Sequence, residues 1–204
     1  MFVHMLLMLL QGSTTPPPDP EPDLLMPVSL AEAKAWLRED LDEHDALITA
    51  LIGAAGSTIE QQTGVVTGGQ RVAEFTYPTF GERLVLPRRP LIEVIGIDYD
   101  AMSDGAESTV EEGIWRVREF AGQPALLPMP GTSWPGAFVA PGAVRVVARV
   151  GYATRGDVPE ALRQAALMLV GHWFHNREAA STGMQEVPLG ARALMAPFRR
   201  GLIG

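Results

Sequence analysis

Two histidines and a glutamate near the C-terminus are the residues best suited to hold a metal ion. His172, His175 and Glu178 recur at steps of three residues in a stretch with helical periodicity. Each step falls short of a full helical turn by about 60°, so the three side chains fan over about 120° of the helix surface. Zinc hydrolases instead place two histidines four positions apart with a glutamate between them. We therefore expect these histidines to pack and hydrogen-bond, and we predict no metal site and no cofactor.

Other catalytic patterns are also missing from the sequence. The acidic run Glu39–Asp45 resembles a calcium loop in composition, but it lacks the central glycine and the closing glutamate. Gly64, Gly68 and Gly69 match neither a phosphate-binding loop nor a dinucleotide fingerprint, and no serine lies in a nucleophile elbow. The chain contains no cysteine, which excludes thiol catalysis and cysteine-ligated zinc. The sequence therefore predicts a protein that is not an enzyme.

Two helices are predicted before residue 70. Ser29-Leu-Ala-Glu32 forms a capping box that opens a helix ending near Arg38. A second helix spans about 43–63 and closes at Gly64. Its expected buried face follows helical spacing: Leu47, Leu51, Ala54, Ala55 and Ile59, flanked by Ile48 and Ile52.

Between Gln70 and Gly151 apolar residues recur at every second position instead of with helical spacing, which predicts an antiparallel sheet module inserted between helices. The alternating apolar residues are Ala73, Phe75 and Tyr77; Ile95, Ile97 and Tyr99; Trp115 and Val117; and Val144, Val146, Ala148 and Val150. Helix returns after Pro159 and runs to about Ala180, followed by a short helix over 188–195. The predicted fold class is α+β: a small helical bundle (29–69 and 152–186), an inserted β module (70–151) and an extended C-terminal segment (187–204).

The first 28 residues are predicted to be an apolar arm and a linker. Met1–Leu10 is strongly apolar, but it is about half as long as a membrane span, and no Lys or Arg precedes Lys34 as a secretory signal would require. A mobile arm, a packing strand and an over-extended start of the chain are favoured over a signal or anchor. Residues 11–23 contain five prolines and form an extended linker. We expect no membrane partner.

Charge is distributed unevenly along the 204 residues. Residues 1–64 carry ten acidic and two basic side chains, residues 65–160 twelve and nine, and residues 161–204 two and five. The acidic N-terminal part and the basic C-terminal part give each subunit two unlike faces, which can attract each other between neighbouring copies. The net charge of −8 disfavours tight DNA binding by counterion release, although DNA can slide past a negative wall.

The order of these elements and their amino-acid sequences resemble the head–tail connector, or adaptor, family of tailed bacteriophages and gene transfer agents. Within that family the resemblance is to the group with a β-sheet insertion between helices. The stretches that carry the resemblance are SLAEAKAWLREDLDEHDALITALIGAAGSTIEQQTG (29–64), LVLPRRPLIEVIGIDY (84–99), SWPG (133–136), VRVVARVGYA with VPEALRQAALMLVGHWFHNREA (within 144–179) and VPLGARALMAPFRR (187–200). They are packing and turn patterns, and their order across residues 29–200 makes the resemblance specific.

The resemblance implies a structural protein of the virion neck, made in the host cytoplasm. Twelve copies would form a ring below the portal protein, join the DNA-filled head to the next neck or tail protein (a stopper or tail terminator), and leave a channel through which DNA passes without sequence-specific binding. Another neck component, such as a stopper or a tail-completion protein, is the alternative, and a metal-dependent hydrolase is a remote one.

Two sets of residues are expected to make the contacts of such a ring. The C-terminal segment 187–204 has no acidic residue and combines apolar anchors with arginines, so we expect it to bind portal and to become ordered only there. Its predicted portal-binding residues are Leu189, Arg192, Leu194, Pro197, Phe198, Arg199 and Arg200. The predicted subunit interface comprises Gly53, Ala54, Gly56, Arg88, Arg89 and Trp134. The β module is expected to contact neighbouring subunits rather than carry a pocket.

Overall fold

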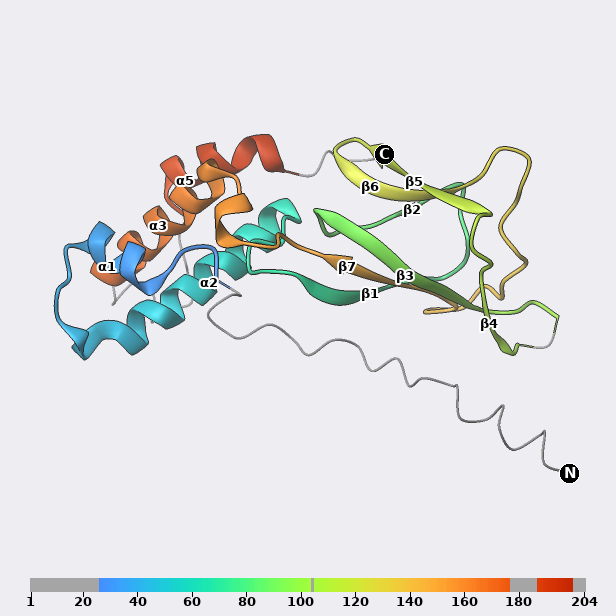
Figure 1. Cartoon of the computed structure of the whole chain (residues 1–204), viewed down its shortest axis with the longest axis horizontal. Coiled ribbons are helices and arrows are strands. Elements are labelled where there is room, and N and C mark those ends of the chain that lie inside the picture. The colour runs from blue at the N-terminus through green and yellow to red at the C-terminus, as the bar shows by residue number, and fades with distance from the viewer. Residues whose placement is uncertain (1–25, 104, 177–186, 200–204) are drawn as a thin grey trace, which may run out of the picture.

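The computed structural model describes residues 26–103, 105–176 and 187–199, which form a helical lobe and a β lobe side by side (Figure 1). The helices are α1 (Leu30–Leu37), α2 (Asp45–Thr63), α3 (Glu160–His175) and α5 (Leu189–Met195), with short 3-10 turns η2 (Asp42–His44), η3 (Arg155–Asp157) and η4 (Ala196–Phe198). The strands are β1 (Arg71–Tyr77), β2 (Leu84–Val85), β3 (Leu91–Asp100), β4 (Glu107–Thr109), β5 (Trp115–Phe120), β6 (Gln123–Pro128) and β7 (Val144–Val150). Residues 1–25 of the predicted arm and linker, Glu178 and Arg200 lie outside the described residues, whereas Val28 is fully buried in the helical core.

The ends of the first two helices are those that the sequence predicts. At the start of α1, the Ser29 hydroxyl accepts a hydrogen bond from the Glu32 backbone N–H at 3.1 Å, and the Glu32 carboxylate accepts one from the Ser29 N–H at 2.7 Å. At the end of α2, Gly64 has a φ of 74°, a left-handed conformation that glycine adopts without strain. The capping box and the C-terminal glycine of this region are confirmed.

The buried face of α2 is rotated from the predicted one. Ile48, Ile52 and Ile59 are fully buried, as is Ala55, whereas Leu47 is 36% exposed. The sequence offers apolar residues at two adjacent helical stripes, and periodicity alone does not choose between them. The contacts of α2 with α1 and α3 decide the choice, because they cover the stripe that contains the isoleucines.

The C-terminal helix α5 belongs to the helical lobe instead of extending from it. Ala191 and Met195 are fully buried in the same core as the isoleucines of α2, and α5 packs mainly on α3. Gly190 permits the close approach, since a Cβ there would lie 2.4 Å from Cε of Met168. The expectation that this segment becomes ordered only on a partner is therefore corrected for residues 187–199.

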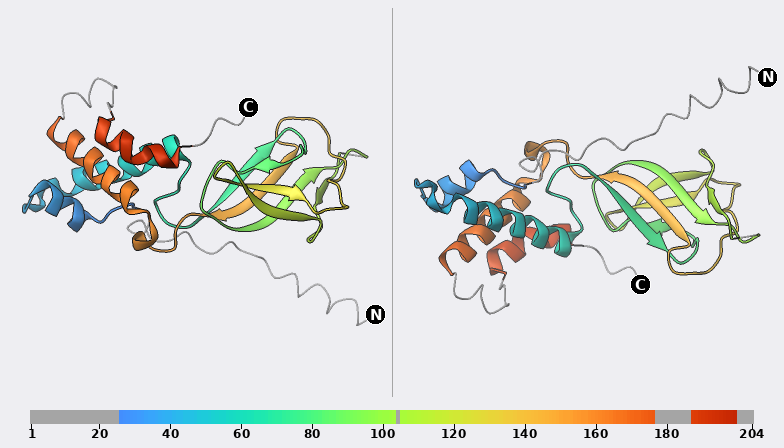
Figure 2. Two further views of the ribbon diagram at one scale, coloured as in Figure 1. Left: turned by 90° about the horizontal axis from the view of Figure 1, so that it is seen from above. Right: turned by 90° about the horizontal axis from the view of Figure 1, so that it is seen from below.

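The β lobe consists of two antiparallel sheets rather than a single one. The larger sheet has the order β1-β7-β3-β4 and the smaller one the order β2-β6-β5, and both lie to one side of the helices in every view (Figure 2). The central strand β7 buries Val144, Val146, Ala148 and Val150, as its alternation predicts. These side chains pack with Phe75 and with Leu126 of the smaller sheet in one apolar core.

Strand β3 breaks the alternation that its sequence suggests. Its pairing with β7 shifts register between Leu91 and Glu93 and again between Val94 and Gly96. Such irregularities turn the following side chain to the other face of the sheet. As a result Val94 and Ile97 contact the core while Ile95 is 51% exposed, so the prediction that Ile95 shares the inner face with Ile97 is wrong.

Two arginines that come just before β3 link the two lobes. The Arg89 guanidinium donates hydrogen bonds to the carbonyl of Gly122, in the β5–β6 turn, and to the carbonyl of Phe198, after α5. Arg88 forms an ion pair of 2.8 Å with Glu60 of α2, which also pairs with Arg71 of β1. Both arginines that the sequence assigns to a subunit interface are thus engaged within the chain.

We predict that Arg89→Ala destabilises the protein by about 2–4 kcal/mol, because it removes two hydrogen bonds from a charged group and leaves two carbonyls without their donor. Urea unfolding measures the change. Arg118→Ala, at an exposed arginine of β5, is the matched control and should stay within about 0.5 kcal/mol of the parent chain. Equal stability of the two variants would contradict the role of Arg89.

A second prediction concerns how the contribution of Glu32 to stability depends on pH. Burial by itself raises the pKa of Glu32, but the hydrogen bonds from Ser29 and the charge of Arg163 outweigh it, so the pKa lies below its ordinary value of 4.5. A lowered folded-state pKa stabilises the fold above the unfolded value and loses that contribution as the pH falls. Glu32→Gln keeps the capping geometry without the charge. The difference in unfolding free energy between the parent and Glu32→Gln should therefore be present at pH 7 and shrink below about pH 4.5; a constant difference would contradict this.

Candidate assembly surfaces

The described residues offer surfaces for protein contacts rather than a catalytic cluster. No group of His, Asp and Glu within 26–103, 105–176 and 187–199 could hold a metal ion. The His172 backbone carbonyl accepts a hydrogen bond from the Asn176 side chain at 2.7 Å, and the His175 ring contacts the Phe174 ring edge to face. Within the same ranges, no helix has both the length and the apolar character to cross a membrane.

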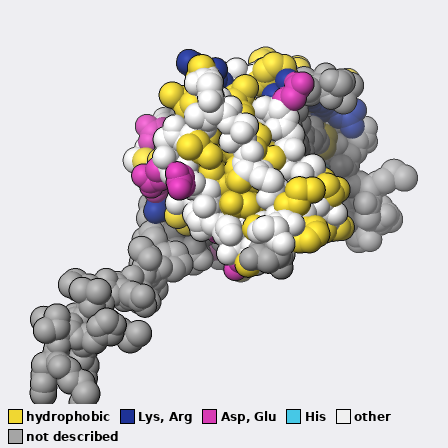
Figure 3. Space-filling view, turned by 90° about the vertical axis from the view of Figure 1, so that its right-hand side faces the viewer, with side chains coloured by type: hydrophobic (Ala, Val, Ile, Leu, Met, Phe, Trp, Pro, Cys, Tyr) yellow, Lys and Arg dark blue, Asp and Glu magenta, His cyan; other side chains and the backbone are white. Residues whose placement is uncertain are grey.

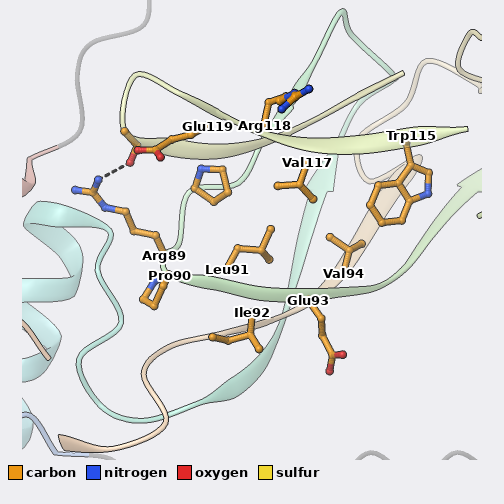
Figure 4. A pocket seen from close by; sticks show the side chains of 12 residues that line it. Arg89, Pro90, Leu91, Ile92, Glu93, Val94, Trp115, Val117, Arg118 and Glu119 are labelled. Carbon is orange, nitrogen blue, oxygen red and sulfur yellow. Dashed lines mark hydrogen bonds between the residues drawn. The ribbon is translucent and has the colours of Figure 1, made fainter. Parts of the chain in front are cut away.

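A groove of about 490 Å³ lies between β3 and β5 (Figure 4). Its floor and walls are apolar and come from both sheets: Leu91, Ile92, Val94, Trp115, Val117 and Pro124. Figure 4 shows Leu91 of β3 and Val117 of β5 pointing toward each other across it. Charged side chains of both signs, including Glu93 and Arg118, stand at its rim. The expectation that the β lobe carries no pocket is therefore wrong.

Two strand edges without a neighbour border this groove. One edge of β3 pairs with β7, but on the other edge β4 reaches only Asp98–Asp100, which leaves Leu91–Gly96 unpaired by any described strand. Strand β5 pairs with β6 on one side, and no described strand covers its other side. An apolar groove beside open strand edges is suited to an extended apolar peptide, which can pair its main chain with an edge.

The end of the β lobe that faces away from the helices carries an apolar tip. Met102 is 66%, Phe138 46% and Val139 76% exposed, and the loops that bear them are joined by hydrogen bonds from Met102 N–H to Gly136 and from Phe138 N–H to Asp100. Figure 3 looks onto this end and shows hydrophobic side chains over much of its surface. Exposed apolar clusters of this kind commonly mark protein contact sites.

The predicted subunit-interface residues fall into different environments. A Cβ added at Gly53 would meet nothing within 4 Å, so this position on α2 faces open space. Ala54 packs partly against the helical core, and Gly56 lies against Pro27 at 3.1 Å from an added Cβ. Trp134 stacks on Phe80 with 4.9 Å between ring centroids. Of the six residues, Gly53 is the one whose surroundings within the chain leave most room for a neighbour.

The predicted portal-binding residues fall into an exposed group and a group that packs on the helical core. Leu189 is 82% exposed, and Arg192, Pro197 and Arg199 are also exposed. By contrast, Leu194 and Phe198 pack against the helical core. Arg192 and Arg199 line a hollow of about 630 Å³ together with Gln62 and Ala193, and no acidic residue among those that the structure describes lines it. Two guanidinium groups at one hollow are suited to bind carboxylates.

Residues 27–115 match the family described as phage gp6-like head–tail connector protein. The fold is similar to that of a chain in a structure titled as the virion of a native gene transfer agent particle, with a TM-score of 0.69, 23% identity, and coverage of 86% of this chain and 91% of that one. It is also similar to a chain in the neck of a native gene transfer agent particle computed with C12 symmetry, with a TM-score of 0.66, 22% identity, and coverage of 89% and 92%. No curated protein matches the chain.

These matches confirm the resemblance and the α+β class that the sequence predicts. The family match covers α1, α2 and the first strands, and the likeness of fold extends over the helical lobe and the β lobe together. They support a structural connector or adaptor of a particle neck.

Proposed function

We propose that this chain is a subunit of a head–tail connector at the neck of a phage-like particle and that its role is structural rather than catalytic. The observation that carries the proposal is the match of residues 27–115 to the connector family. The likeness of fold to chains of a gene transfer agent neck supports it. The described surface fits the role, since its open features are apolar clusters, strand edges and an arginine-lined hollow.

The proposed assembly is a ring of twelve with a central DNA channel. Each subunit of a closed ring presents one face to a different face of the next subunit. The face of α2 around Gly53 is the proposed interface, because a Cβ added at Gly53 meets nothing within 4 Å, which leaves room for a side chain of the neighbour. The C12 symmetry of the neck that has a similar fold agrees with this number. The proposed partners beyond the ring are the portal protein on one side and the next neck or tail protein on the other.

Portal binding is proposed for the exposed side of α5 and η4. Arg192 and Arg199 would pair with portal carboxylates at the hollow, and Leu189 would supply an apolar anchor. Leu194 and Phe198 act indirectly, because they hold α5 and η4 on the helical core. Arg200 lies outside the described residues and stays a candidate on the grounds of its sequence.

The ring is tested at Gly53. Gly53→Leu should leave the isolated subunit as stable or about 0.5–1 kcal/mol more stable, since glycine is unfavourable inside a helix and the added side chain meets open space. The same change should prevent ring formation on purified portal by occupying the space of the neighbouring subunit. Thermal unfolding and electron microscopy of portal complexes measure the two effects.

Gly53→Ala is the matched control, because it gives the same gain in helix propensity with little added volume, and it should still assemble. Rings of normal symmetry from Gly53→Leu would remove this face of α2 from the interface. Failure of the parent chain to bind portal at all would contradict the proposed function itself.

Portal binding is tested by charge reversal at the hollow. Arg192→Glu with Arg199→Glu should weaken retention by immobilised portal at least about tenfold, because paired attraction becomes repulsion. The melting temperature should hardly change, since both side chains are exposed. Arg118→Glu in the β lobe is the control with unchanged binding. Phe198→Ala, which removes packing against the helical core, should instead lower stability by about 1–3 kcal/mol. Full retention of the double variant would exclude the hollow as the docking site.

A further inference from the structure

The groove between β3 and β5 lacks an occupant among the described residues. Its apolar wall leaves Val117 43% exposed, and the main-chain groups along Leu91–Gly96 have no described strand as a partner on the groove side. Unpaired edges of this kind invite another strand, and native proteins usually cover or blunt them. A segment that covers this groove should be extended, apolar on its side chains and about six residues long or longer.

The N-terminal segment of the same chain has these properties. Residues 1–10, MFVHMLLMLL, contain no charged residue, and His4 is their one polar side chain. In an extended strand successive side chains point to opposite faces, and here both faces would be apolar. Such a strand can pair its main chain with an open edge and place apolar side chains against the groove, whichever of its faces turns inward. Ten extended residues span about 33 Å, longer than the open stretch of β3.

The described chain begins close to one end of the groove. Pro27 lies against Gly56, and the Cβ position of Gly56 is 3.7 Å from the Thr67 hydroxyl. Val66, which precedes Thr67 in the chain, donates its backbone N–H to the Arg89 carbonyl at 2.8 Å, and Arg89 lines the groove. Residues 11–25 form a tether of fifteen residues, which spans up to about 46 Å when extended. The tether is therefore long enough for the segment to reach the groove of its own chain.

We infer that residues 1–10 bind in the groove between β3 and β5 of their own chain, with apolar side chains against Leu91, Val94 and Val117 and the main chain paired with an open strand edge. The link through residues 11–25 makes binding to the chain's own groove intramolecular, which favours it over the groove of a neighbour at ordinary protein concentrations. The segment closes the edge that would otherwise be open to pairing with other proteins. This inference does not depend on the ring or on portal binding.

Hydrogen exchange of the full chain tests the inference, in comparison with a variant that lacks residues 2–10. Removing the segment should speed exchange of the backbone amides of 91–96 and 115–120 by about tenfold or more, because the bound strand no longer protects them. Exchange in the helical lobe should not change. Leu6→Asp with Leu7→Asp in the full chain should reproduce the effect without a deletion, which guards against a variant that fails to fold.

The groove is tested from its other side with Val117→Asp, which should give the same faster exchange in the otherwise intact chain. Ile95→Asp is the matched control, since Ile95 is an exposed residue of β3 that does not line the groove, and it should leave exchange at 115–120 unchanged. A synthetic peptide of residues 1–25 added to the deletion variant should restore protection, and it should fail to do so with Val117→Asp.

Two results would overturn the inference. One is equal exchange at both strand edges in the full chain and the deletion variant. The other is protection that appears only with concentration-dependent dimers in analytical ultracentrifugation, which would assign the groove to a second copy of the chain. Protection in a monomer that the deletion and Val117→Asp both remove supports the binding of the segment in its own chain.

Discussion

The fold depends on a polar junction between two lobes that have separate apolar cores. The helical core and the β core share none of their buried residues, so hydrophobic packing by itself stabilises each lobe rather than their arrangement. Arg89 supplies a link by hydrogen bonding to carbonyls of the β5–β6 turn and of the C-terminal end of η4. Glu60 supplies another by pairing with Arg71 and Arg88. Guanidinium groups suit this task, because each offers several donors in a rigid plane.

The junction also relates the surfaces to which we assign functions. Arg89 lies at one end of the groove and bonds to the backbone beside the hollow that Arg192 and Arg199 line. The position of the C-terminal turn relative to the β lobe is therefore fixed by the same side chain that borders the groove. A structural protein that joins two partners requires such fixed geometry, since a force on one contact surface must reach the other through the subunit.

The residues predicted to bind portal illustrate how far sequence arguments reach. Apolar and basic residues in 187–200 predict a contact segment, but composition does not distinguish anchors for a partner from anchors for the chain's own core. The structure makes that distinction, because Phe198 and Leu194 face the helical core while Leu189 points outward. The groove between β3 and β5 was not predicted, since its walls come from strands about twenty residues apart whose pairing with other strands is what leaves them open.

The sequence by itself determined the features that depend on near neighbours along the chain. The capping box at Ser29, the left-handed end of α2 at Gly64 and the alternation of β7 are all local, because their hydrogen bonds and side-chain directions involve residues within a few positions. Only the tertiary structure decided which stripe of α2 is buried, why Ile95 faces outward and how the strands divide into two sheets. Those outcomes depend on contacts between residues distant in sequence, since burial is set by whatever element packs opposite and a register shift in one strand appears only against its partner.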